Sequence, residues 1–112
     1  MPESAVSEWV RVAAAAEIGP GEVLRVDIDD VPVAIWNVEG ALYATDDTCT
    51  HEEASLSEGD LWGEIIECPL HGAQFDVRTG AVVSLPAIFP IATYPVKVEG
   101  DAVYVGWRDG AR

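Results

Sequence analysis

Two short stretches decide what this chain can be: Cys49-Thr50-His51 and Cys68-Pro69-Leu70-His71. Together they contain every cysteine and every histidine of the 112-residue sequence. Thiolate and imidazole are the ligands that proteins use for zinc and for iron–sulfur centres, and each stretch offers one of each. The sequence therefore predicts a metal centre with Cys49, His51, Cys68 and His71 as its ligands.

The order of these ligands argues against a zinc finger. A zinc finger of the Cys2His2 type places its two cysteines together and its two histidines together on a helix. Here sulfur and nitrogen donors are mixed in each stretch, sixteen residues separate His51 from Cys68, and no helical pattern follows. An interaction domain built on structural zinc stays open as an alternative.

The sequence around the two stretches is typical of an all-β domain. Short runs of β-branched and aromatic residues are bounded by Gly, Pro and Asp. Glu39-Gly40 and Glu99-Gly100 each lie between two such runs, which predicts two tight hairpins. We expect antiparallel strands at residues 8–12, 22–28, 32–38, 41–45, 62–67, 74–77, 81–84, 91–98 and 102–107.

Composition and charge narrow the function further. The length suits a single domain, and 49% hydrophobic residues are enough for a core. The 6 basic and 20 acidic residues give a net charge of −14, which repels nucleic acid and anionic membranes. The longest apolar run, Val12–Ala16, is too short to span a bilayer, and the N-terminus lacks the pattern of a secretory signal. We therefore expect a cytoplasmic protein without nucleic-acid or membrane partners.

The spacing C-x-H, sixteen residues, C-x2-H resembles the Rieske family. Phe75-Asp76, Thr79-Gly80 and Leu85-Pro86 resemble the family's segments after its second ligand box. The resemblance implies an antiparallel β-sandwich or barrel, with a basal scaffold at 8–45 and 87–108 and an inserted cluster-binding subdomain at about 46–86. It also implies one [2Fe–2S] cluster per chain, with Cys49 and Cys68 on one iron and His51 and His71 on the other.

Within this family, the sequence is similar to the ferredoxins of bacterial aromatic-ring-hydroxylating dioxygenase systems. Such a ferredoxin is a soluble one-electron carrier, expected to be a monomer, between a flavin-containing NAD(P)H reductase and a terminal oxygenase. With both histidines used by the cluster, the chain cannot form the second iron site of an oxygenase, and no G-x-G-x-x-G segment follows a strand. We therefore expect an electron-transfer component and no enzyme. A Rieske subunit of another redox enzyme, such as the small subunit of nitrite reductase, is the alternative.

The resemblance also predicts a low reduction potential. Respiratory Rieske proteins carry an extra cysteine in each box, whereas the corresponding positions here are Glu53 or Ala54 and Leu70, so that disulfide cannot form. High-potential members place a Ser and a Tyr after the second box, where this chain has Ala73 and Phe75. Hydrogen bonds to sulfur raise the potential, so we expect a value near the low end of the Rieske range of about −150 to +300 mV.

Two features near the ligands suggest how a partner docks. Glu52 and Glu53 follow the first stretch directly, and three further acidic residues, Glu58, Asp60 and Glu64, lie close in sequence, so they could steer the encounter. Leu70 and Pro86 are apolar residues expected on loops beside the cluster. They form either a small docking patch or a cover that keeps water from the cluster.

Overall fold

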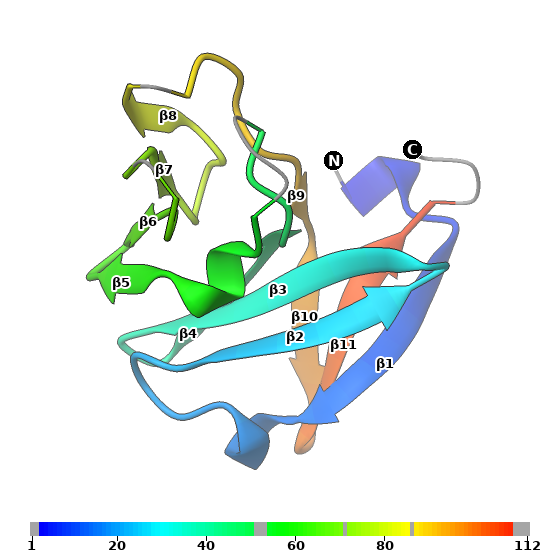
Figure 1. The fold of residues 1–112 in the computed structure, drawn as a ribbon. Coiled ribbons are helices and arrows are strands. Elements are labelled where there is room, and N and C mark those ends of the chain that lie inside the picture. Colours follow the sequence, from blue (N-terminus) through cyan, green and yellow to red (C-terminus); the bar gives the residue numbers. More distant parts are fainter. Residues whose placement is uncertain (1–2, 51–53, 71, 86, 109–112) are drawn as a thin grey trace.

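The computed structural model describes residues 3–50, 54–70, 72–85 and 87–108, which form three antiparallel β-sheets (Figure 1). The fold class is therefore all-β, as predicted. The described residues also form three short 3-10 turns: η1 (Glu3–Ala5) precedes the first strand, and η2 (Ala15–Glu17) and η3 (Leu56–Glu58) lie between strands. No helix among the described residues is long and apolar enough to cross a membrane.

The sheets are nested along the chain, with the strands of sheet three inserted between those of sheet two, and the strands of sheet two between those of sheet one. Sheet one has the order β1 (Glu8–Ala14), β11 (Ala102–Trp107), β10 (Val96–Glu99). Sheet two has the order β2 (Val23–Ile28), β3 (Val31–Val38), β4 (Ala41–Asp46), β9 (Thr93–Tyr94). Sheet three has the order β5 (Asp60–Trp62), β6 (Ile65–Glu67), β7 (Gln74–Asp76), β8 (Val82–Ser84).

Strand β3 separates two hydrophobic cores. Val33 and Ile35 point into the core shared with sheet one, whereas Ala34 and Trp36 point into the core shared with sheet three. All four residues are buried, because side chains of a strand alternate between its faces and both faces of β3 are covered. Sheet two is thus the middle layer, and the core on its sheet-three side contains both cysteines.

The two predicted hairpins are confirmed as β3–β4, with Glu39-Gly40 in the turn, and β10–β11, whose turn is one residue later than predicted, at Gly100-Asp101, because Glu99 still pairs with Ala102. Two predicted strands are wrong in extent. The run 62–67 is a hairpin, with β5 paired to β6 and Gly63 at φ 64° in the turn. The run 91–98 divides at Pro95, which has no N–H to donate, so that β9 pairs with β4 and β10 pairs with β11.

Candidate metal centre

The first predicted ligand loop begins just after β4. Thr48 forms a β-bridge with Ser55, and the N–H of Cys49 donates a hydrogen bond to the carbonyl oxygen of Ala54 at 3.0 Å. These contacts close the loop at its base, where Cys49 is buried. This backbone hydrogen bond therefore fixes the position of the Cys49 main chain, from which the side chain extends. A metal ligand must be held in place in this way.

The second predicted ligand loop connects β6 to β7. The N–H of Cys68 donates to the carbonyl oxygen of Ala73 at 2.7 Å, and Cys68 is also buried. Gly72 has φ of 73°, a left-handed conformation that glycine adopts without a steric penalty. Both loops therefore follow one plan, in which the N–H of a buried cysteine is bonded to the residue five positions later.

The two loops meet in the core between sheets two and three. Cys49 and Cys68 belong to the same cluster of buried side chains, together with Ala73 and Phe75. The backbone between the loops is also tightly packed, because a Cβ atom at Gly59 would lie 2.0 Å from the carbonyl oxygen of Glu67, the residue before Cys68. The fold thus brings both sulfur donors to one place.

The other predicted ligands, His51 and His71, lie outside the described residues, as do Glu52, Glu53 and Pro86. The donors that the structure does describe fit a metal centre. Both cysteines are thiols and form no disulfide. Ionising a thiol among apolar side chains is costly without a cation, whereas a metal ion supplies that charge directly. Two sulfur donors in one buried place are half of the predicted ligand set.

Near the second loop, the turn after β7 is held by a pair of ionised side chains. Arg78 donates to both carboxylate oxygens of Asp76, at 3.2 and 2.9 Å. This hydrogen bond from Arg78 is the main reason why the pKa of Asp76 lies below its ordinary value. Asp76 directly follows Phe75, so the charged turn stabilises the end of the strand that leaves the second loop.

Sequence reasoning missed two groups of residues beside the loops. One is a buried acid, Asp47, which no pattern separates from the other acidic residues of the chain. The other is the pair Ile88 and Phe89, which lie after β8 and are highly exposed. The Thr50 hydroxyl donates to the carbonyl oxygen of Phe89 at 2.7 Å, which attaches this segment to the first ligand loop. The run of large apolar residues beside Leu85-Pro86 is the sequence signal from which the exposed pair Ile88 and Phe89 could have been predicted.

A comparison with protein-family models decides the family. The model of the Rieske [2Fe–2S] domain matches residues 8–95, which include both ligand loops. The chain belongs to the Rieske family. The predicted fold and the predicted [2Fe–2S] cofactor of this Rieske domain are therefore confirmed.

Relatives of known role are ferredoxins. The ferredoxin CarAc of Metapseudomonas resinovorans is 46% identical over 98 residues, which cover 87% of this Rieske chain and 92% of the relative. The ferredoxin component of a naphthalene 1,2-dioxygenase system from Pseudomonas aeruginosa is also 46% identical, over 88% of this chain and 94% of its own. The expected class, an electron-transfer component similar to dioxygenase ferredoxins, is confirmed by these relatives.

A solved structure agrees with the sequence comparison. The ferredoxin in a complex of reduced oxygenase and oxidised ferredoxin of carbazole 1,9a-dioxygenase superimposes with a TM-score of 0.85. It is 44% identical, and the match covers 89% of this Rieske chain and 94% of that chain. The structural likeness therefore extends over nearly nine tenths of the chain.

Proposed function

We propose that this Rieske protein carries single electrons through a cluster held by Cys49 and Cys68 on one iron and by His51 and His71 on the other. The observation that supports this ligand set most strongly is the burial of Cys49 and Cys68 in one cluster of side chains. Each cysteine begins a loop, and a hydrogen bond donated by the N–H of that cysteine closes the loop. The subdomain at about 46–86 is proposed as the cluster-binding part, and it contains all of sheet three.

The ligand charges explain why this site takes up an electron readily. Bound there, the cluster supplies one-electron redox chemistry. Two thiolates and two neutral imidazoles give the oxidised centre a total charge of about zero, against about −2 with four cysteines. Because apolar surroundings disfavour charge, the mixed ligand set makes the added electron easier to accommodate. His51 and His71 thus set the potential as well as the metal geometry.

We further propose that a flavin-containing NAD(P)H reductase supplies the electron and that the terminal oxygenase of an aromatic-ring dioxygenase receives it. The names of the relatives support the oxygenase, and a solved structure of a similar ferredoxin contains its oxygenase partner. The reductase is inferred because a carrier in such a system needs a donor. The cytoplasmic location and the monomeric state stay predictions.

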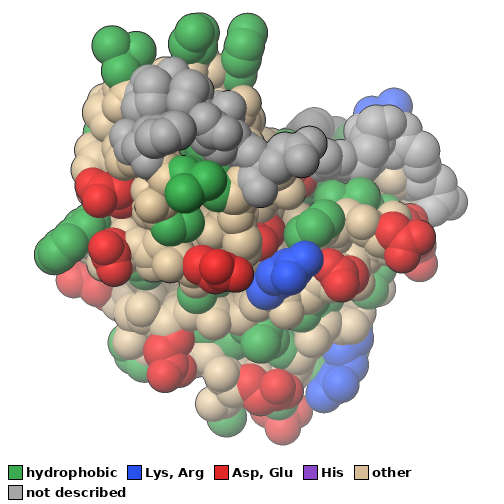
Figure 2. Space-filling model, in the orientation of Figure 1, with side chains coloured by type: hydrophobic (Ala, Val, Ile, Leu, Met, Phe, Trp, Pro, Cys, Tyr) green, Lys and Arg blue, Asp and Glu red, His purple; other side chains and the backbone are tan. Residues whose placement is uncertain are grey.

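An exposed apolar surface supports docking at the cluster end. Leu70, Leu85, Ile88 and Phe89 are all exposed, and we call them the apolar tip. Figure 2 shows hydrophobic side chains projecting from the end of the molecule where β8 and the segment after it lie in Figure 1. Exposed large apolar residues gathered at one place mark interaction sites. We therefore propose that the apolar tip contacts the oxygenase. Of the two roles expected for the apolar loop residues, this proposal favours a docking patch over a cover that keeps water from the cluster.

Electron transfer to purified oxygenase tests this assignment. The double variant Ile88→Ser/Phe89→Ser removes two side chains that are 74% and 67% exposed, so the fold should tolerate it. We expect the ferredoxin concentration for half-maximal rate to rise about tenfold, since losing 1.4 kcal/mol of contact energy changes affinity tenfold. Stopped-flow oxidation of the reduced protein measures this change.

The matched control is Val98→Ser. Val98 is also exposed, but it lies in β10, whose hairpin with β11 is at the opposite end of the molecule from β8 (Figure 1). The control should keep the rate of the wild-type protein. If the tip variant and the control transfer electrons equally well, the oxygenase does not dock on the apolar tip.

A further inference from the structure

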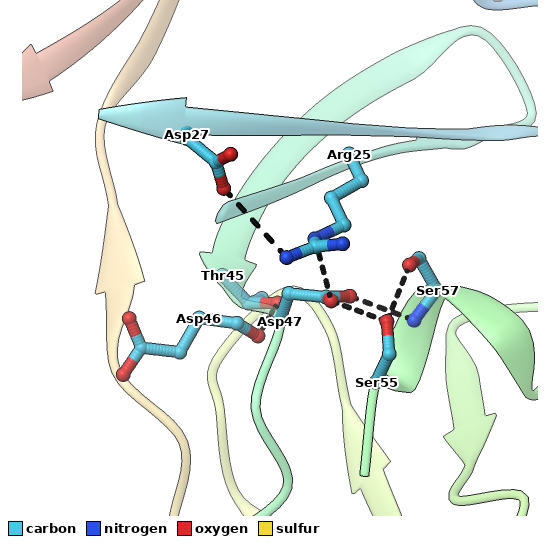
Figure 3. Close-up of polar contacts among 7 residues, drawn as sticks. All are labelled: Arg25, Asp27, Thr45, Asp46, Asp47, Ser55 and Ser57. Carbon is cyan, nitrogen blue, oxygen red and sulfur yellow. Dashed lines mark hydrogen bonds and ion pairs between the residues drawn. The ribbon is translucent and has the colours of Figure 1, made fainter. Parts of the chain in front are cut away.

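A buried carboxylate lies at the base of the first ligand loop, two residues before Cys49. Asp47 is only 1% exposed. Its Oδ1 accepts a hydrogen bond from the N–H of Ser57 at 2.8 Å, and its Oδ2 accepts one from the Ser55 hydroxyl (Figure 3). The Arg25 Nε lies 3.4 Å from the same Oδ2. Three donors from two separate segments therefore converge on one carboxylate.

These contacts join the two arms of the loop. The outgoing arm is Asp47 itself, and the returning arm contains Ser55 and Ser57. The backbone of Asp47 reinforces the connection, because its carbonyl oxygen accepts the N–H of Leu56 at 2.6 Å. Between these arms lies Cys49. Any change in the spacing of the arms is therefore transmitted to the cysteine.

The same residue ties the loop to the middle sheet. The N–H of Asp47 donates to the carbonyl oxygen of Pro32 in β3 at 3.0 Å, and Arg25 extends from β2. Figure 3 shows the guanidinium of Arg25 between Asp47 and Asp27, and its distance to Asp27 is 3.7 Å. The loop base is thus anchored on a rigid sheet on one side and on its own returning arm on the other.

A buried charge is an expensive way to close a loop. Removing a carboxylate from water is costly, and the pairing with Arg25 offsets that cost only in part, because Arg25 itself is half exposed. At the second ligand loop, the N–H of Cys68 and the uncharged amide of Gln74, which donates to Glu67 at 3.0 Å, connect the two arms, and neither cysteine loop has a second carboxylate as deeply buried as Asp47 among the described residues. The placement of this charge beside a sulfur donor points to a role in the site.

We propose that Asp47 is a positioning residue for Cys49 and that Arg25 balances its charge toward the cluster. This inference rests on the proposed function of Cys49 as a cluster ligand. Asp47 fixes the loop geometry, and the Asp47–Arg25 pair presents almost no net charge to the metal centre. Loss of Arg25 leaves the buried carboxylate of Asp47 without its cation, whereas loss of the Asp47 charge leaves Arg25 paired with Asp27 alone.

Two variants with opposite predicted shifts test the charge balance. Asp47→Asn removes a negative charge, so the midpoint potential should rise. Arg25→Gln removes a positive charge, so the midpoint potential should fall. A general loosening of the fold does not predict shifts of opposite sign. The control, Lys97→Gln, removes an equal positive charge from β10 and should leave the potential near the wild-type value.

Cluster retention tests the positioning role. The holoprotein is incubated with a ferrous chelator and the loss of visible absorbance is followed. Asp47→Asn should lose the cluster several-fold faster than the wild-type protein, with Ser55→Ala between the two and Lys97→Gln unchanged. Ser55→Ala removes a single hydroxyl, so it keeps the test valid even where Asp47→Asn folds poorly.

Shifts of equal sign, shifts no larger than that of Lys97→Gln, or wild-type retention in both Asp47→Asn and Ser55→Ala overturn the inference. Iron and labile-sulfide analysis of the wild-type protein separates this failure from failure of the proposed function. A wild-type protein without a [2Fe–2S] cluster would refute the ligand set itself. A normal cluster in the wild-type protein, with unchanged potential and retention in the variants, would refute only the role of Asp47.

Discussion

Ala73 and Phe75 are fully buried in the same cluster of side chains as Cys49 and Cys68. Neither side chain can donate a hydrogen bond. The carbonyl oxygen of Ala73 accepts a hydrogen bond from the N–H of Cys68, but the Ala73 methyl group offers no donor toward sulfur. These two side chains therefore do not stabilise an added negative charge on sulfur, which is the basis for predicting a low potential.

Adding a hydroxyl at either position should raise the midpoint potential. Ala73→Ser and Phe75→Tyr each supply a donor toward sulfur, and a hydrogen bond to a charged acceptor strengthens as the charge grows. A strengthening of about 1 kcal/mol corresponds to roughly 40 mV for one electron. Protein-film voltammetry measures the shift.

The control for this pair is Val103→Thr, which adds a buried hydroxyl in the other core. It should reduce stability without changing the potential. Unchanged potentials in both Ala73→Ser and Phe75→Tyr, with the new hydroxyls within reach of sulfur, would show that hydrogen bonding from these positions does not tune the potential.

At the residue scale, the sequence predicts the ligands because Cys and His are rare here and fall in two stretches. The positioning contacts are not predictable in this way. Asp47 is one of 20 acidic residues, and its burial depends on Arg25, Pro32 and Ser57, which are distant in sequence. Only the folded chain distinguishes a buried carboxylate from a solvated one.

At the element scale, nearly all predicted strands exist because runs of β-branched residues alternate with turn residues. The errors at 62–67 and 91–98 have one cause, which is that apolar runs continue across a chain reversal or a change of sheet. Trp62 and Ile65 flank a turn made by Gly63 and Glu64. A single glycine or proline inside an apolar run is a weak signal, so the break follows from pairing partners that the sequence does not show.

A glycine after β7 illustrates how tightly the elements are joined. Gly80 has φ of 79°, and a Cβ there would lie 2.1 Å from the carbonyl oxygen of Ile91. Gly80→Ala combines a left-handed backbone with a clash, so we expect it to destabilise the protein by about 2–4 kcal/mol. Gly100→Ala shares the positive φ, 62°, but meets no atom within 4 Å, and about 1 kcal/mol is expected. Thermal unfolding of the two holoproteins measures the difference, and equal melting temperatures would contradict this packing.

At the scale of the whole molecule, β3 lies in the middle sheet, and its two faces contribute to a basal core and to the core with both cysteines. The run of apolar residues in β3 is explained by this double burial. From the sequence alone, the run indicates a strand but not which sheets cover it, because the covering strands are distant in sequence.

The net charge of −14 leads to a prediction about association. If acidic residues near the ligands steer docking, the bimolecular rate with reductase or oxygenase should fall as salt rises, since the Debye length shrinks from about 10 Å at 0.1 M to about 3 Å at 1 M. Glu52→Lys/Glu53→Lys should slow association several-fold. Glu39→Lys/Asp101→Lys changes the net charge equally at exposed turns and should have a smaller effect. Stopped-flow rates independent of salt would show that the acidity does not steer.

The central claim is that two histidines and two cysteines of this chain share one [2Fe–2S] cluster, and pulsed electron paramagnetic resonance of the reduced protein tests it most directly. The account predicts strong magnetic couplings from two imidazole nitrogens. One of them should disappear in His51→Cys and the other in His71→Cys, wherever the cluster is retained. A reduced cluster without nitrogen couplings, or a wild-type spectrum unchanged by both substitutions, would contradict the account.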